Sequence, residues 1–146
     1  MEYASPLNAH GIKCFNVPGL GEKLSGIYHI SSAVVIPANK RTVVTAGQTG
    51  YTADMKLPTD LTEEYIQAFQ NVVDSLAAGG VKDGFASVYQ LTTYHVGGLD
   101  AAVNKALEVV LEKFFGQNRP AWAGVGVEAL ADGAKVEIVA WAVLPN

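Results

Sequence analysis

One carboxylate is placed where it could do acid–base chemistry. Glu137 interrupts an apolar run from Val136 to Ala140, and a carboxyl group with apolar neighbours carries protons near neutral pH better than one in water. The alternative is a carboxylate that points to solvent from the outer face of a strand, because side chains alternate between the two faces. The residues alone favour the second interpretation.

Trp122 is another side chain that could meet a ligand. Its flat apolar ring could stack on an aromatic or neutral molecule, or attract a cation. A tryptophan that fills space at a subunit interface explains the residue equally well, so the residues leave both interpretations open.

The remaining reactive side chains predict no further centre. Three histidines occur, but no two have ligand spacing on one helix, which argues against a metal site: His10, His29 and His95. The single cysteine, Cys14, has no histidine or arginine beside it to favour a thiolate. Gly19-Leu20-Gly21 begins like a phosphate-binding loop, but Leu24 stands where a third glycine is needed.

The composition predicts one sparingly charged domain that spans residues 1–146. The length allows a single hydrophobic core, and 16% of the residues are charged, against about 25% in average globular domains. So few charges suggest that part of the surface is hidden against a partner. A net charge of −4 with scattered basic residues predicts no nucleic-acid partner, since phosphate binding needs clustered Lys and Arg.

Sequence signals also bear on where the protein works. No uncharged stretch is long and apolar enough to cross a membrane, and no basic-then-apolar leader begins the chain. A single cysteine excludes an intramolecular disulfide framework and suggests a reducing compartment. We therefore expect no membrane association and a cytoplasmic location, with mitochondria as the alternative.

Two segments have the periodicity of amphipathic helices. Residues 61–78 follow Asp60, a favourable N-cap, and end at Gly79. Residues 99–115 follow a pair of glycines and end at Gly116. Each segment carries one apolar stripe at helical spacing, which predicts a helix that buries one side.

The rest of the chain predicts strands. Residues 26–36 and 41–46 are rich in residues that favour strands and flank a turn, so they indicate a hairpin. Further strands are expected at residues 87–96, at residues 121–128 and 134–143 as a second hairpin around Asp132-Gly133, and at residues 14–17 as a short edge strand.

The predicted order β-β-α-β-α-β-β indicates an α+β sheet with both helices on one face. The opposite face should also be covered, because five side chains offer more apolar surface than two helices can hide: Val34, Val43, Val125, Ile138 and Trp141. Self-association explains this most simply.

Five collinear motifs resemble the Rid family of small proteins, also called YjgF or, misleadingly, L-PSP endoribonuclease. In chain order they are Thr45-Ala46-Gly47-Gln48; Gln67 and Asn71 with Leu76-Ala77-Ala78-Gly79; Val103-Asn104 with Phe114-Phe115-Gly116; Arg119-Pro120-Ala121; and Leu130 and Gly133 with Val136-Glu137-Ile138. No single motif is specific, so their common order carries the resemblance, which covers about residues 30–143.

The resemblance implies a fold like that of the AroH type of chorismate mutase, and a homotrimer with a cleft at each subunit interface. It implies hydrolysis of reactive imines and enamines, such as 2-aminoacrylate, with no metal or organic cofactor. The expected partners are thus a small-molecule substrate and further copies of the chain.

Matching the motifs residue by residue gives a candidate site. Glu137 takes the acid–base role. Gly47 and Gln48 take positions where backbone groups line the cleft, and a glycine allows a ligand to come close. Asn104 matches an asparagine on the cleft side of the second helix.

Departures from the family pattern bear on specificity. Trp122 stands where the imine deaminases carry an arginine that grips the substrate carboxylate in a bidentate pair, and Gly124 stands where a cysteine is common. Ile30 falls near the position of a tyrosine in the first strand. Arg119 could replace the missing anchor if it turned into the cleft. Without an anchor, acids of the aminoacrylate type should bind poorly.

The sequence therefore predicts a small-molecule enzyme that processes an imine, enamine or related metabolite with atypical specificity. The alternative is a non-catalytic trimer that binds a metabolite or a protein, which the missing arginine suggests. Ribonuclease activity rests only on a family label, and the acidic charge balance disfavours it.

Overall fold

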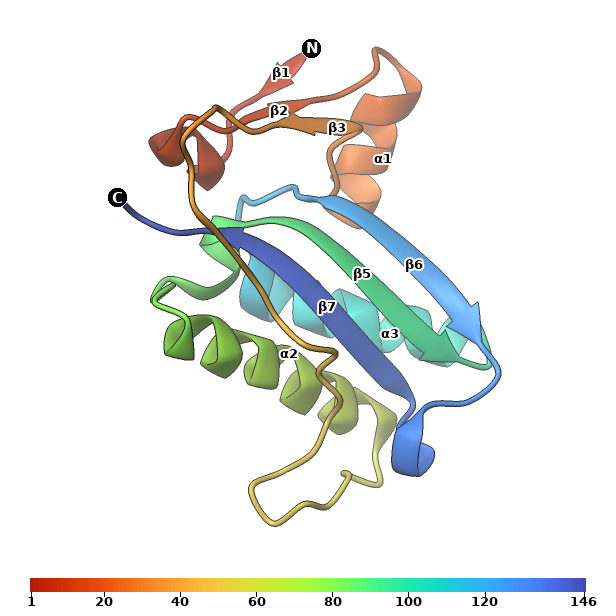
Figure 1. Ribbon diagram of the computed structural model, residues 1–146. Helices are drawn as coiled ribbons and strands as arrows, with labels where there is room; N and C mark the ends of the chain where they lie inside the picture. The colour runs from red at the N-terminus through yellow and green to blue at the C-terminus, as the bar shows by residue number, and fades with distance from the viewer.

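The computed structural model describes residues 1–146 and places a four-stranded sheet at the centre (Figure 1). Its strands are β4 (Thr42–Val44), β5 (Val88–Val96), β6 (Ala121–Val127) and β7 (Val136–Val143), in the spatial order β4-β7-β5-β6. β7 runs antiparallel to both of its neighbours, whereas β5 and β6 are parallel. The fold is of the predicted α+β class.

Two helices cover one face of this sheet, as Figure 1 shows, and no helix covers the other face. α2 (Leu61–Ala78) has the predicted bounds, and the Asp60 carboxylate accepts a hydrogen bond from the Glu63 backbone N–H at 2.9 Å, as an N-cap does. α3 (Ala101–Val110) is shorter than predicted, because the chain continues into a π-helical turn, Leu111–Phe115.

The main core fills the space between these helices and the sheet. Phe69 and Leu76 of α2 are fully buried in it, as is Ile138 of β7. Phe115 stacks on Trp122 with nearly parallel rings, whose centroids are 5.3 Å apart. This stacking joins the end of the α3 segment to the beginning of β6.

The first 35 residues form a smaller layer at one end of the main sheet (Figure 1). β1 (Glu2–Tyr3), β2 (Lys13–Phe15) and β3 (Ala33–Val35) make a three-stranded antiparallel sheet, and helix α1 (Leu20–Tyr28) joins β2 to β3. β2, predicted as an edge strand at residues 14–17, lies in the middle of this sheet. None of the helices in the structure is both long and apolar enough to cross a membrane.

A buried asparagine connects this layer to the main body. The Asn118 side chain donates hydrogen bonds to the Phe85 and Val88 carbonyls and accepts one from the Ser5 hydroxyl. Cys14 is fully buried in a second apolar cluster, which includes Val143 of β7. The two layers therefore share both polar and apolar contacts.

The predicted hairpin of residues 26–36 and 41–46 is wrong. Residues 20–28 form α1, which begins where the Glu22 carboxylate accepts from the Gly19 N–H and ends at His29, whose φ of 55° is left-handed. β3 then pairs with β2, and β4 pairs with β7. Ile27 and Tyr28, which favoured a strand, lie exposed on α1. A helix of nine residues is too short for its periodicity to outweigh such local preferences.

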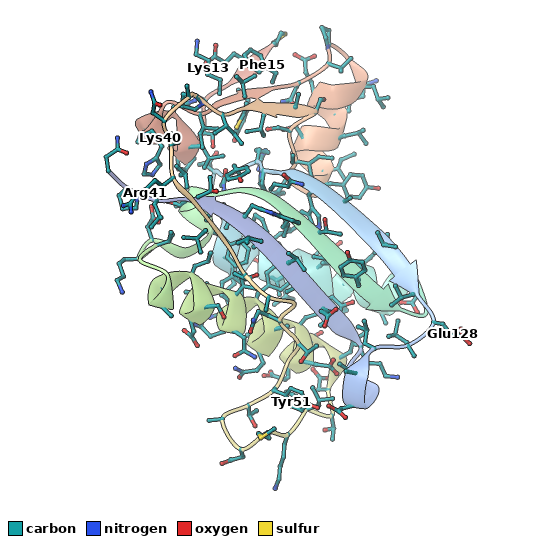
Figure 2. The ribbon with its side chains drawn as sticks, viewed as in Figure 1. Lys13, Phe15, Lys40, Arg41, Tyr51 and Glu128 are labelled. Carbon is teal, nitrogen blue, oxygen red and sulfur yellow. The ribbon has the colours of Figure 1, made fainter.

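The second predicted hairpin is also wrong, although its turn is present. Asp132 and Gly133 have left-handed φ values of 56° and 79°, but β6 and β7 do not pair, because β5 lies between them. β6 instead pairs in parallel with β5, which requires the long crossover that α3 provides. The hydroxyl group of Tyr51, which is labelled near the lower end of Figure 2, donates a hydrogen bond to the Asp132 carboxylate at 2.6 Å.

The face of the main sheet without helices is called here the open face. It carries Tyr94 of β5, Val125 of β6, and Glu137, Val139 and Trp141 of β7, as strand register and alternation require. Of the five side chains predicted to cover this face, only two lie on it. Val43 and Ile138 pack in the main core, and Val34 packs against the second cluster, because the pairing of their strands differs from the predicted one.

A chain of hydrogen bonds crosses the main core from α2 to β6. The Tyr65 hydroxyl lies 2.6 Å from His95 Nδ1, and Thr93 Oγ1 lies 2.7 Å from His95 Nε2. The Trp122 indole N–H donates to Thr93 Oγ1 at 3.0 Å. Burial lowers the pKa of His95 from 6.5 to about 4 and raises the pKa of Tyr65. Both side chains are therefore neutral at physiological pH.

The buried histidine predicts an acid sensitivity that one substitution removes. His95 takes up a proton near pH 6.5 in the unfolded chain but only near pH 4 in the folded protein. Its contribution to stability is therefore present above pH 6.5 and is lost as the pH falls to 4. Over this interval we expect the free energy of unfolding to fall by up to about 3 kcal/mol more in the wild type than in His95→Gln. Urea unfolding at several pH values measures both losses, and equal losses would exclude His95 as the cause.

Candidate functional site

Glu137 lies on the open face, against the chain that leaves β4. Two backbone hydrogen bonds of 2.8 and 2.9 Å pair Gln48 with Ile138, which brings Gly47 against the Glu137 side chain. A Cβ atom on Gly47 would lie 2.7 Å from Glu137 Cδ and 2.9 Å from Glu137 Oε1. The absence of a side chain at residue 47 therefore leaves the space that the half-buried carboxylate occupies.

A cavity of about 390 Å³ lies on the other side of the sheet, at its β6 edge. Its wall is largely apolar, with polar groups at a few points, which is typical of a small-molecule site. The apolar lining side chains are Ile27, Ile30, Leu99, Leu107, Leu111 and Trp122, and the other lining residues are Tyr28, Thr93, His95, Asn104, Glu108 and Gly124. They come from α1, β5, β6, and the helix α3 with its flanks.

The floor of the cavity is made by β5 and β6. A Cβ atom on Gly124 would lie 3.6 Å from Thr93 Oγ1 and 3.7 Å from His95 Nε2, so glycine keeps the volume above the buried hydrogen-bond chain free. Two contacts hold Trp122 in place: Phe115 stacks on its ring, and Thr93 Oγ1 accepts a hydrogen bond from its indole N–H. The indole therefore presents ring surface to the cavity rather than a free donor.

The N-terminal layer closes one end of the cavity. α1 brings Ile27 and Tyr28 to the wall, and the left-handed His29 then turns the chain so that Ile30 follows them. The Ser31 N–H donates to the Pro120 carbonyl at 3.1 Å, which holds this segment against the beginning of β6. Burial, and to a lesser extent the Arg119 guanidinium, lower the pKa of His29 from 6.5.

Arg119 does not line this cavity. Its guanidinium lies over the Tyr3 ring, 5.1 Å from the ring centroid, and lines a separate pocket of about 250 Å³ in the N-terminal layer. Its Nε and Nη1 atoms are buried without a hydrogen-bond partner. The expectation that Arg119 replaces the missing carboxylate-binding arginine would require its side chain to move away from Tyr3.

The residues predicted for one site thus fall into two groups. Ile30, Asn104 and Trp122 line the cavity on the helix side of the sheet. Gly47 and Glu137 are in contact on the open face, with Gln48 beside them. Within one chain the sheet separates the two groups.

Sequence reasoning missed several lining residues that simple spacing could have found. Thr93 precedes His95 by two residues on β5, so both face the same side. The register pairs Thr93 with Gly124 and His95 with Gly126, two and four residues after Trp122 on β6. Glu108 follows Asn104 by one helical turn, which puts both on one face of α3. These signals become usable only when one residue of the site and the strand pairing are known.

The cavity is poor in charge. Glu108 is the one charged side chain of the cavity lining, because His95 is neutral and no Lys or Arg belongs to the lining. No group of three His, Cys, Asp or Glu side chains lies close enough to hold a metal ion. The arrangement can therefore bind a small, largely apolar molecule through contact, a few hydrogen bonds and one negative charge.

Comparisons with known proteins agree with this architecture. Residues 22–144 match the family model described as Endoribonuclease L-PSP, whereas no curated protein matches the chain. YyfB from Yersinia pestis, described as a protein of unknown function of the conserved Rid family, is 28% identical. Its structure covers 91% of this chain and 98% of its own, with a TM-score of 0.74.

Two further solved structures are similar. RidA from the Antarctic bacterium Psychrobacter is 26% identical over 79% of this chain and 90% of its own, with a TM-score of 0.61. The YjgF gene product of E. coli is 26% identical over 74% of this chain and 84% of its own, with a TM-score of 0.58. The family model spans most of the sequence, and the chain therefore belongs to the Rid family, also named Endoribonuclease L-PSP.

Proposed function

We propose that this protein hydrolyses a reactive imine or enamine in a cleft between subunits of a homotrimer. One observation carries the proposal: the Glu137 carboxylate and the ligand cavity lie on opposite faces of one sheet. Within a single chain, the Glu137 carboxylate therefore cannot reach a ligand that is bound in the cavity. A second copy that packs on the open face would bring its own cavity wall towards Glu137 and complete the site.

The open face supports such packing. Val44 and Val125 are 57% and 40% exposed, and Val139 and Trp141 beside them are only half-buried. Apolar surface of this kind is stabilised when another subunit covers it. The cyclic symmetry of a trimer would repeat the same contact three times and close the assembly.

The proposed chemistry needs one group that exchanges protons. Glu137 would take a proton from water as the oxygen attacks the imine carbon and the C=N electron pair moves to nitrogen. It would return this proton to the nitrogen, and would then move the proton of the new hydroxyl group to the nitrogen as the C–N bond breaks and the C=O bond forms, so that a carbonyl compound and ammonia leave. One positioned carboxylate can act first as base and then as acid.

The cavity supports a substrate unlike that of the acid-specific deaminases. By the family resemblance, Trp122 stands where those deaminases carry the carboxylate-binding arginine; Trp122 lines the cavity, whereas Arg119 lines a different pocket. A charge-assisted hydrogen bond contributes about 1.5–3 kcal/mol, so an acid substrate would lose most of its anchoring. The same absence favours the alternative, a trimer that binds a metabolite without turnover.

Two substitutions at the carboxylate test catalysis. We expect Glu137→Gln to lower kcat for ammonia release by about 100-fold, because general acid–base groups contribute about 10²–10⁴-fold. Gly47→Ala should lower kcat as well, since its Cβ would displace the carboxylate. Its thermal stability should change little, because the displaced carboxylate is the mobile end of a side chain.

The assay uses a panel of imines derived from neutral and acidic amino compounds. Glu128→Gln is the matched control, because Glu128 lies beyond the end of β6 (Figure 2), is exposed, and neither lines the cavity nor contacts Gly47. Equal kcat values for the wild type and Glu137→Gln on every turned-over imine would remove the catalytic role. Tight binding without turnover would instead support the alternative function.

A separate measurement tests the assembly. Light scattering should give about three times the chain mass of 15.4 kDa. Val44→Lys should reduce this mass, because it places a charge on the open face, whereas Val109→Lys on the outside of α3 should leave it unchanged. A wild-type protein that remains monomeric would exclude both the trimer and the inter-subunit site.

A further inference from the structure

The charge of the cavity wall distinguishes between ligands. Glu108 of α3 lies one turn after Asn104, and the lining contains no basic side chain to balance its carboxylate. A carboxylate ligand would enter next to a like charge with no donor of opposite charge, which is unfavourable. A cation would instead find an opposite charge at the rim of an apolar space.

Aromatic side chains strengthen the preference for a cation. Trp122 and Tyr28 line the same cavity as Glu108. The negative face of an indole ring attracts a cation more strongly than other aromatic side chains do. The Trp122 N–H is already donated to Thr93, so the ring contributes its electron-rich surface and does not supply a donor that would suit an anion.

The size of the cavity limits the ligand further. A volume of about 390 Å³ is near the lower end of the range for small-molecule sites, about 300–1,000 Å³. Ile27, Ile30 and Leu111 provide apolar wall. The best fit is a small molecule that joins one positive nitrogen to a compact apolar or aromatic group.

We propose that the cavity selects small organic cations without a carboxylate, of the arylalkylammonium or iminium class, through the Glu108 carboxylate and the Trp122 ring. The assignment of a substrate rests on the proposed hydrolysis: for that reaction, the substrate is the protonated imine of an amine and not that of an amino acid. The binding preference itself requires no turnover.

Binding of three matched probes tests the proposal. Benzylammonium, benzyl alcohol and benzoate have similar shapes and carry positive, zero and negative charge. Isothermal titration calorimetry should give an order of affinity that follows this order of charge, with benzylammonium at least about fivefold tighter than benzyl alcohol, as one partly exposed charge pair or cation–π contact allows.

Substitutions locate the preference. Glu108→Gln should weaken benzylammonium binding about fivefold and leave benzyl alcohol unchanged, and Trp122→Leu should also weaken the cation. Glu112→Gln is the matched control, since Glu112 lies on the next turn, is exposed and does not line the cavity. Trp122→Arg should reverse the order and favour benzoate.

Two results would overturn the proposal. One is benzoate binding as tightly as benzylammonium to the wild type, and the other is an equal effect of Glu108→Gln and Glu112→Gln on the cation. Because these titrations measure binding alone, their failure leaves the role of Glu137 in hydrolysis untouched. An inactive enzyme that still prefers the cation would retain this inference and remove the proposed reaction.

Discussion

A buried histidine needs a partner for each ring nitrogen, and the placement of three elements depends on that requirement. Tyr65 of α2 and Thr93 of β5 supply the partners of His95, and Trp122 of β6 joins through Thr93. A buried polar group left unpaired costs about 1–3 kcal/mol. The chain of bonds therefore holds α2, β5 and β6 in one relative position, and with them the floor of the cavity.

The two faces of the main sheet differ in what covers them and in which side chains they carry. The helix side buries the main core and, at the β6 edge, leaves a cavity lined by few polar groups. The open face presents a carboxylate within an apolar surface. Each side chain of a strand points to one face of the sheet only. The alternation along β7 therefore places Glu137 on the open face, away from the cavity. In the proposed trimer this separation is resolved by symmetry, because each cavity meets the open face of a neighbour.

Local signals predicted the fold where local physics decides it. α2 has both its predicted ends, since a capping carboxylate and a glycine act within one turn. Strand pairing was mispredicted because it depends on distant partners: the residues of a hairpin turn are present at Asp132-Gly133, yet β5 separates the strands they connect. Family motifs suggested Glu137, Asn104 and Trp122 as site residues, but they could not show that Glu137 lies on the opposite side of the sheet from the other two. Thr93, His95 and Glu108 were missed because their positions gain meaning only from that arrangement.

The parallel crossover from β5 through α3 to β6 has a consequence for how this protein can change over time. One continuous segment, residues 88–127, supplies most of the cavity wall, whereas β4, β7 and the chain around Gly47 supply the carboxylate and its support. In the proposed enzyme, ligand preference and proton transfer are therefore encoded in different stretches of the gene. In such an enzyme, an exchange of Trp122 alone would alter what binds and would leave Glu137 and Gly47 in place.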